Sequence, residues 1–344
     1  MPKWYTIGCA YLLTLVVIWL TAKIFVFTWH NRPPPRFVYD TDVNRYANIS
    51  TARRRIPRVI HQIMAYTKTW GMDVPPKWNA SYQSVLTKNV GEFEYLLWTD
   101  QNISAFIQKY EPEFYKNTYL TYKYDMQRVD SFRYVLLYHL GGIYLDMDNG
   151  CNRPFKDLLN TIEALDPNSP HLAAFPRSEA FGVETDLLVT TPGHPLYKRL
   201  VSRLHSFNHR FIFHFWTILI SAGPIYASIQ ERLFSTTSEG NTVRMIDYNV
   251  FQPMFIWKEK GHTWIGRDAA FLFFISAKSA YLLNAFIIFT IIVITLLFIR
   301  CFNLQRNNHS VYYTPLIEHS IWKPILIAKQ FLFSHYSNRR KINK

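Results

Sequence analysis

An α/β domain with flanking transmembrane helices is the fold class that the sequence predicts. Runs typical of strands and of helices alternate between residues 56 and 206, which is the pattern of a largely parallel sheet covered by helices. Apolar runs at 7–29 and 280–299 lie on either side and are long enough to cross a bilayer. The chain has 344 residues, of which 49% are hydrophobic, so it can bury a large core.

The clearest element is a helix that ends at two glycines. Its apolar residues recur at intervals of three and four, as one face of a helix requires: Val129, Phe132, Leu136 and Leu140. Gly141 and Gly142 follow, and their permissive backbone is typical of a helix end. The helix is therefore predicted to stop before Gly141.

A short strand with two acidic residues follows the glycines. Residues 143–145 form an apolar run that suits a buried strand, and a period of two places Asp146 and Asp148 on one side with Met147 on the other. Two carboxylates at the carboxyl end of a strand in an α/β sheet are suited to bind a divalent cation together with a diphosphate. The alternative for an isolated Asp-x-Asp is a solvated turn.

Two charged residues on the preceding helix favour a site over a turn. Asp130 and Arg133 lie one helical turn apart at the border of the apolar stripe. Both can therefore point toward the sheet edge where the strand ends. Charges buried at such an edge need partners.

Further elements are predicted around this centre. Strands are expected at 56–63, 94–98, 171–176 and 183–190, and helices at 101–110 and 195–206. Residues 211–228 are apolar and aromatic, but His214 and the Ala-Gly-Pro break at 222–224 interrupt them. We interpret this segment as a helix or loop that faces lipid, with ordinary core as the alternative.

The two apolar runs predict the membrane topology. Residues 7–29 are too long for a signal-peptide core and are interpreted as an uncleaved anchor in which Lys23 reaches the interface; a cleaved signal is the alternative. Basic residues after the second run place the C-terminal tail in the cytosol. The predicted order is a cytosolic terminus (1–6), an anchor (7–29), a stem (30–55), a lumenal domain (56–279), a span (280–299) and a basic cytosolic tail (300–344).

The net charge of +14 is concentrated at the ends of the chain. Residues 1–36 carry +4 and residues 300–344 carry +7, which leaves +3 for the rest. Basic ends beside apolar segments indicate a membrane surface rather than a nucleic-acid groove. Asn-x-Ser sequons at Asn48, Asn79 and Asn102 fit a lumenal glycoprotein.

Residues 128–151 resemble the core motif of glycosyltransferase family 32. The matching pattern is Arg128-x-Asp130-x-x-Arg133, followed by Gly141-Gly142-x-Tyr144-x-Asp146-x-Asp148. Within that family, Tyr-Leu-Asp-Met-Asp-Asn-Gly-Cys at 144–151 resembles the fungal inositol phosphorylceramide mannosyltransferases. The resemblance extends from Arg55 to Ala270 and implies a GT-A type nucleotide-sugar-binding fold for the lumenal domain.

The resemblance implies roles for the central residues. Asp148 would bind Mn²⁺ or Mg²⁺ directly, and Asp146 would hold a metal-bound water or the ribose. Asp130 and Arg133 would fix the sugar hydroxyls, and Arg128 would lie near the phosphates. These assignments follow from the family motif and not from spacing alone.

Four substrate contacts elsewhere are also implied. His61, Gln62 and Trp98 would line the nucleotide end of the site, although a hydrogen-bonded buried histidine and a core tryptophan are the alternatives on physical grounds. Asp186 is a further candidate contact. Thr185 stands before it where family members usually have asparagine, which puts any contact of that asparagine in doubt.

A late motif would complete the site. Gly261-His262-Thr263-Trp264 resembles the family's Gly-Ser-Ser-Trp element, which closes over the diphosphate and the metal. Trp264 is therefore a candidate substrate contact. His262 replaces the usual serine and is a candidate metal ligand, because a neutral imidazole can bind Mn²⁺.

The function implied by the resemblance is retaining transfer of mannose from GDP-mannose to inositol phosphorylceramide in sphingolipid synthesis. The metal would offset the charge that develops on the leaving GDP. The alternatives are a Golgi N-glycan α-mannosyltransferase and a non-catalytic regulatory subunit with the same fold. We expect membrane lipids and a multispanning membrane regulatory subunit as partners, no nucleic acid, and location in the Golgi or endoplasmic reticulum membrane.

Overall fold

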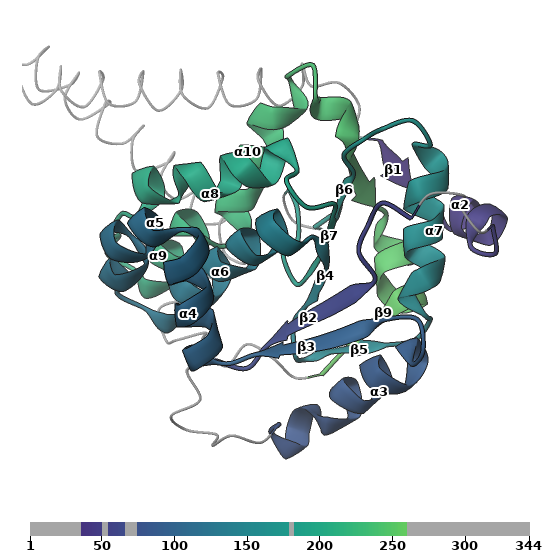
Figure 1. Ribbon diagram of the computed structural model, residues 1–344, viewed down its shortest axis with the longest axis horizontal. Coiled ribbons are helices and arrows are strands. Elements are labelled where there is room, and N and C mark those ends of the chain that lie inside the picture. The colour runs from purple at the N-terminus through teal and green to yellow at the C-terminus, as the bar shows by residue number, and fades with distance from the viewer. Residues whose placement is uncertain (1–35, 50–53, 66–73, 179–181, 260–344) are drawn as a thin grey trace, which may run out of the picture. The chain divides into compact units, whose positions relative to one another are not determined.

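A seven-stranded sheet lies at the centre of the structure (Figure 1), a computed structural model that describes residues 36–49, 54–65, 74–178 and 182–259. Its strands are β1 (Phe37–Val38), β2 (Val59–Ile63), β3 (Glu94–Trp98), β4 (Gly142–Leu145), β6 (Ala173–Pro176), β7 (Leu187–Thr190) and β8 (Val243–Ile246). The order is β1-β8-β6-β7-β4-β2-β3. β7 is antiparallel to both of its neighbours, and all other neighbouring pairs are parallel. This confirms the predicted α/β class, and the sheet is largely parallel.

Helices cover both faces of the sheet. They are α2 (Asp40–Tyr46), α3 (Asn79–Asn89), α4 (Asp100–Tyr110), α5 (Pro112–Asn117), α6 (Asp125–Leu140), α7 (Phe155–Leu165), α8 (Pro195–Phe207), α9 (His214–Ser221) and α10 (Pro224–Ser235). Short helical turns lie at Pro76–Trp78, Tyr119–Thr121, Gly240–Thr242 and Val250–Phe255. A separate antiparallel pair, β5 (Asn149–Cys151) and β9 (Ile256–Lys258), lies beside the sheet.

Alternation along the central strands divides the core into two parts. On β4, Ile143 and Leu145 contact one core, while Tyr144 contacts the other. The Tyr144 core is completed by α4, α6, α8 and α10, and the opposite core by α2, α3 and α7. The helices of the two cores lie on opposite sides of the sheet in Figure 1. Each large apolar side chain buried in this way contributes about 1.5–3 kcal/mol to folding.

The turn between α6 and β4 requires both of its glycines. The backbone φ is +65° at Gly141 and +92° at Gly142, a region that other residues rarely adopt. A Cβ atom on Gly142 would lie 2.7 Å from the carbonyl oxygen of Val59, and one on Gly141 would lie 2.7 Å from the backbone nitrogen of Pro192. The predicted helix end is confirmed, and close backbone packing explains why two glycines are needed.

The predicted elements agree with the structure at their centres and differ at their ends. The strand at 94–98 and the helices at 101–110 and 195–206 correspond to β3, α4 and α8. The strand predicted at 183–190 begins only at Leu187, because Val183 forms an isolated bridge with Arg177. Residues 211–228 form two helices, α9 and α10, which are separated at the predicted break.

Part of the predicted stem belongs to the folded unit. Residues 37 and 38 form β1, which pairs in parallel with β8, and α2 packs against α7 with Val43 fully buried. The domain therefore starts before the predicted boundary at residue 56. The predicted spans at 7–29 and 280–299 lie outside the described residues. Within the described ranges, no helix combines the length and apolar character needed to cross a bilayer.

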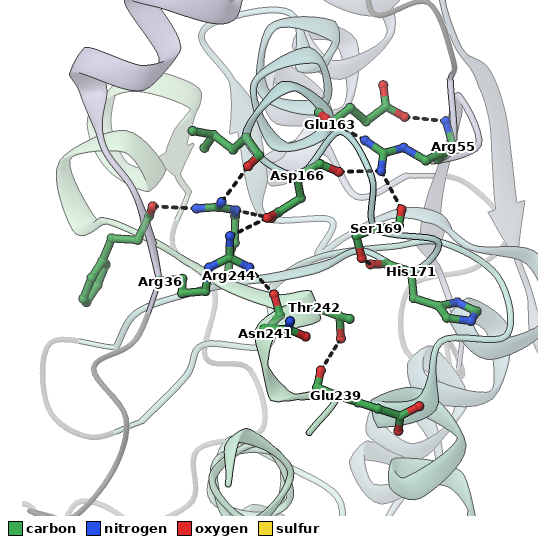
Figure 2. A network of polar contacts seen from close by, with 12 residues as sticks. Arg36, Arg55, Glu163, Asp166, Ser169, His171, Glu239, Asn241, Thr242 and Arg244 are labelled. Atoms are coloured by element: carbon green, nitrogen blue, oxygen red, sulfur yellow. Dashed lines mark hydrogen bonds and ion pairs between the residues drawn. The ribbon is translucent and has the colours of Figure 1, made fainter. Parts of the chain in front are cut away.

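A polar network holds these early residues to the end of α7 (Figure 2). Arg36 and Arg244 both form ion pairs with Asp166. Arg55 donates to the carbonyl oxygens of Asp166 and Ser169 at 2.6 Å each. Arginine side chains thus satisfy carbonyl groups at and beyond the C-terminus of α7, where the helix dipole also favours positive charge. The network is structural and lies among β1, α7 and β8.

Candidate active site

A cavity of about 610 Å³ lies where β2 and β4 end and β7 begins. Because β7 is antiparallel to β4, its first residue, Leu187, pairs with Leu145, the last residue of β4. The backbone N–H of Asp146 accordingly donates to the carbonyl oxygen of Asp186 at 2.9 Å. Two acidic segments that are far apart in the sequence therefore meet at one edge of the sheet, the usual place for ligands in α/β folds.

Four carboxyl groups line this part of the cavity: those of Asp146, Asp148, Glu184 and Asp186. Burial raises the pKa of Asp148 to about 7, and repulsion from Asp146 and Asp186 adds to the effect. Burial also raises the pKa of Glu184, and repulsion from Asp186 and Asp146 adds to that shift. The pKa of Asp146 is likewise raised by burial. The Oδ1 atom of Asp186 has no hydrogen-bond partner among the described residues. The cluster is therefore short of positive charge.

The two acids of the Asp-x-Asp motif do not continue the strand. β4 ends at Leu145, and the N–H of Asn149 donates to the carbonyl oxygen of Asp146 at 3.1 Å, which closes a turn. The predicted strand alternation through Asp148 is therefore wrong. Both carboxylates nevertheless line the cavity, because the turn folds the chain back toward β5.

Lys258 is a cation at the acidic cluster that sequence reasoning missed. The β5–β9 pairing places it opposite Asn149, and its Nζ lies 2.7 Å from Oδ2 of Asp186. Burial lowers the pKa of Lys258, but attraction to Asp186, Glu184 and Asp146 outweighs burial and raises the pKa overall. The amine therefore remains charged. No local pattern marks it, since only pairing between distant segments brings it to the motif.

Arg133 connects the helix to the acidic strand end. Its Nη2 donates to Oδ1 of Asp130 at 2.6 Å and lies 3.7 Å from Oδ1 of Asp146. The guanidinium also stands over the ring of Tyr144, 4.8 Å from its centroid. Burial raises the pKa of Asp130 to about 6, with Arg133 opposing and Asp146 adding to the shift. The structure thus places Asp130 and Arg133 in the cavity lining, as the helix spacing predicts.

Thr185 has a definite partner in this arrangement. Nη1 of Arg133 donates to its carbonyl oxygen at 2.5 Å and to its Oγ1 at 3.1 Å. Thr185 therefore holds one terminal nitrogen of the guanidinium, while Asp130 holds the other. Thr185 stands where family members usually have asparagine, and its hydroxyl still provides a hydrogen-bond acceptor.

Three predicted nucleotide contacts lie in the core instead of the cavity lining. His61 is fully buried; its Nε2 lies 3.0 Å from the carbonyl oxygen of Gly141, and its Nδ1 accepts from Trp98 at 3.2 Å. Gln62 donates to the carbonyl oxygen of Asp146 at 3.2 Å. His61 is thus a hydrogen-bonded buried histidine and Trp98 a core residue, which are the alternatives given above for them. Gln62 stabilises the backbone just after β4.

The remaining predicted residues divide into two groups. Arg128 bonds Asp125 at 2.8 Å and the carbonyl oxygen of Tyr122 at 2.6 Å, at the start of α6 and outside the cavity lining. His262 and Trp264 lie outside the described residues. Within the described ranges, no group of three or more His, Cys, Asp or Glu side chains is arranged as a metal site.

A less polar part of the lining comes from the segment after β2 and from the starts of α6, α9 and α10. It includes Met64, Ala65, Tyr124, Met126, Val129, His214 and Pro224. The rings of Tyr124 and His214 meet edge to face with centroids 4.2 Å apart. The cavity therefore combines an acidic portion, suited to a cation and a diphosphate, with an apolar and aromatic portion.

Comparison with known proteins gives a consistent result. Residues 75–166 match the family model described as glycosyltransferase sugar-binding region containing DXD motif. A mannosyl phosphorylinositol ceramide synthase of Saccharomyces cerevisiae is 31% identical over 223 residues, which are 63% of this chain and 55% of the relative. Inositol phosphoceramide mannosyltransferase 3 of Schizosaccharomyces pombe is 31% identical over 260 residues, 74% of this chain and 65% of the relative. The chain thus spans little more than half of the first relative's length.

Proposed function

We propose that this chain is a glycosyltransferase that moves mannose from GDP-mannose to inositol phosphorylceramide, because residues 75–166 match the model of the glycosyltransferase sugar-binding region that contains the DXD motif. The observation that carries the proposal is the meeting of Asp146, Asp148 and Asp186 in one cavity at the carboxyl edge of the sheet. The choice of sugar and acceptor is supported by the names of the two relatives, of which one is a mannosyl phosphorylinositol ceramide synthase and the other an inositol phosphoceramide mannosyltransferase.

We assign the described unit to the GT-A class. The assignment is supported by the order of the strands and by the single antiparallel strand, β7, which lies next to the strand that ends at the DXD motif. Such an edge admits a nucleotide at the carboxyl ends of parallel strands. The unit would act on the lumenal side of the Golgi or endoplasmic reticulum membrane, with 7–29 and 280–299 as its spans.

A divalent cation fits the acidic part of the cavity. Asp146 and Asp148 offer carboxylate oxygens, which Mn²⁺ and Mg²⁺ prefer; burial raises the pKa of both, repulsion from neighbouring carboxylates adds to the shift, and a cation would compensate that repulsion. Asp186 lines the same part of the cavity and its Oδ1 has no hydrogen-bond partner among the described residues, but its Oδ2 is paired with Lys258 and the three carboxyl groups are not arranged as a metal site. When bound, the ion would neutralise charge that develops on the leaving diphosphate.

The protein's own residues would hold the two ends of the donor. Lys258 offers a charged amine beside the acids, and it can attract a phosphate oxygen when the carboxylates are occupied by a cation. Asp130 is fixed by Arg133, so its remaining carboxylate oxygen can accept from a sugar hydroxyl with little loss of side-chain entropy. Arg133 holds this geometry through Thr185.

We further propose that the configuration of mannose is retained. Three carboxylates in the cavity lining are candidates to face the reacting carbon of the sugar: Asp130, Glu184 and Asp186. Nuclear magnetic resonance of the first product formed from GDP-α-mannose would decide the point. An α-linked product supports retention, and a β-linked product contradicts it.

An acceptor panel tests the proposed activity. The full-length protein, in vesicles, would receive GDP-mannose with inositol phosphorylceramide, with a mannose-terminated N-glycan, or with no acceptor. Mass spectrometry should detect one added hexose on the ceramide lipid only. Hexose addition to the glycan alone would support N-glycan mannosylation, and no addition in any mixture would favour a non-catalytic subunit.

A further inference from the structure

A loop beside the cavity exposes large apolar side chains. It joins α8 to α9, and with the first three residues of α9 it covers residues 208–216, which we call the rim loop. Ile212 is 97% exposed, Phe211 41% and Trp216 36%. Isolated apolar side chains are common on soluble surfaces, but three within six residues form a local apolar projection that needs an explanation.

The rim loop is held in its outward position by hydrogen bonds. The buried hydroxyl of Thr217 accepts from the N–H of Phe211 at 3.0 Å and lies 3.0 Å from the carbonyl oxygen of Phe213. At the other end, Asn208 donates to the hydroxyl of Thr121 at 2.8 Å. The projection of Ile212 is therefore a property of the folded loop, since both of its ends are fixed.

The charge around the rim loop is predominantly positive. Residues 195–230 contain Lys198, Arg199, Arg203 and Arg210 but no Asp or Glu. Residues 113–125, which include Thr121, contain Lys116 and Lys123 together with Glu113 and Asp125, and Asp125 is paired with Arg128 at 2.8 Å. Apolar side chains with basic neighbours are the combination that binds an anionic bilayer surface, because apolar burial and attraction to anionic headgroups add.

The same segment reaches the cavity. His214 lies two residues after Ile212 and lines the cavity, where its ring meets that of Tyr124. Tyr124 follows Lys123 directly and lies at the start of α6, the helix that carries Asp130 and Arg133. One continuous surface therefore runs from the exposed apolar side chains into the less polar part of the cavity lining.

We propose that the rim loop inserts Phe211, Ile212 and Trp216 into the headgroup region of an anionic bilayer and so sets the cavity entrance at the membrane surface. The occupant of this surface is lipid. This part rests on the proposed function. The headgroup of a lipid-linked acceptor enters the cavity past His214 and Tyr124 while its lipid tails stay in the bilayer, and the acidic part of the cavity binds the water-soluble donor.

Photo-crosslinking tests the contact without using activity. A benzophenone side chain would replace Ile212 in the full-length protein, placed in vesicles of equimolar phosphatidylcholine and phosphatidylinositol that carry a clickable acyl chain. Val90 is the matched control, because it is 79% exposed and apolar but lies at the end of α3. We expect roughly tenfold more lipid attached at position 212 than at position 90. Equal labelling at the two positions would overturn the inference, whether or not the protein transfers mannose.

Activity measurements then separate this inference from the proposed function. Ile212→Asp should lower transfer to the vesicle-borne lipid roughly tenfold and leave transfer to a soluble inositol-phosphate analogue unchanged, while Val90→Asp changes neither. Equal loss with both acceptors in Ile212→Asp would contradict the role in lipid access. Lipid labelling at position 212 in a protein that transfers no mannose would leave the membrane contact standing and refute the proposed function.

Discussion

Replacing Gly142 by alanine should destabilise the protein much more than the same change at Gly91. Both glycines have positive φ, +92° and +79°, so alanine costs about 1–2 kcal/mol at either position. At Gly91 nothing lies within 4 Å of the added Cβ, whereas at Gly142 the carbonyl oxygen of Val59 lies 2.7 Å away. Backbone of a central strand must then move, which adds about 1–3 kcal/mol.

The two variants can be compared by thermal unfolding of the full-length protein in detergent, followed by tryptophan fluorescence at one scan rate. A loss of 1 kcal/mol lowers the midpoint by about 2–4 °C for a unit of this size. Gly142→Ala should therefore unfold about 2–12 °C below Gly91→Ala. Equal midpoints would refute the reasoning, because they would show that β4 and β2 can move apart to fit the added Cβ atom without loss of stability.

Three further changes have defined outcomes. Lys258→Gln should raise KM for the donor and tighten Mn²⁺ binding by calorimetry, because it removes a cation beside Asp186; weaker Mn²⁺ binding would contradict this role. Thr185→Val should cost about 1 kcal/mol, since one acceptor for Arg133 is lost and the carbonyl oxygen remains; an unchanged unfolding midpoint would count against that bond. Burial lowers the pKa of His61 to about 4. Below pH 6.5 the unfolded state therefore binds more protons than the folded state, and the protein loses folding stability as the pH falls. The stability advantage of wild type over His61→Gln should shrink by about 3 kcal/mol between pH 7 and pH 4, and a constant difference would disprove it.

The part of the site that sequence predicts well is local. The spacing from Val129 to Leu140 and the glycine pair are determined by neighbours within a few residues, so the helix end and the start of β4 follow from backbone preferences. Asp130 and Arg133 share a helix face with one turn between them, and they line the cavity for that reason. The family motif lies entirely in this region.

What sequence missed depends on pairing between distant segments. Lys258 reaches the acids only because β9 pairs with β5, and residues 37 and 38 join the sheet only through β8. The period of two predicts a strand that continues to Asp148, whereas a turn after Asp146 begins the return to β5. The family resemblance implies a substrate contact for His61, but both of its ring nitrogens are engaged by Gly141 and Trp98.

Mannose transfer by Asp148→Asn tests the central claim most directly. Wild type, Asp148→Asn and the control Asp40→Asn would be placed in the same vesicles with GDP-mannose, Mn²⁺ and inositol phosphorylceramide; the side chain of Asp40 is exposed at the start of α2. Asparagine keeps the shape of the side chain but removes its charge, so the cavity should lose most of its cation affinity and its transfer activity while the unfolding midpoint does not fall. We expect wild-type transfer in Asp40→Asn and at least about a hundredfold loss in Asp148→Asn. Wild-type turnover in Asp148→Asn would contradict the claim that this cavity is where the donor reacts.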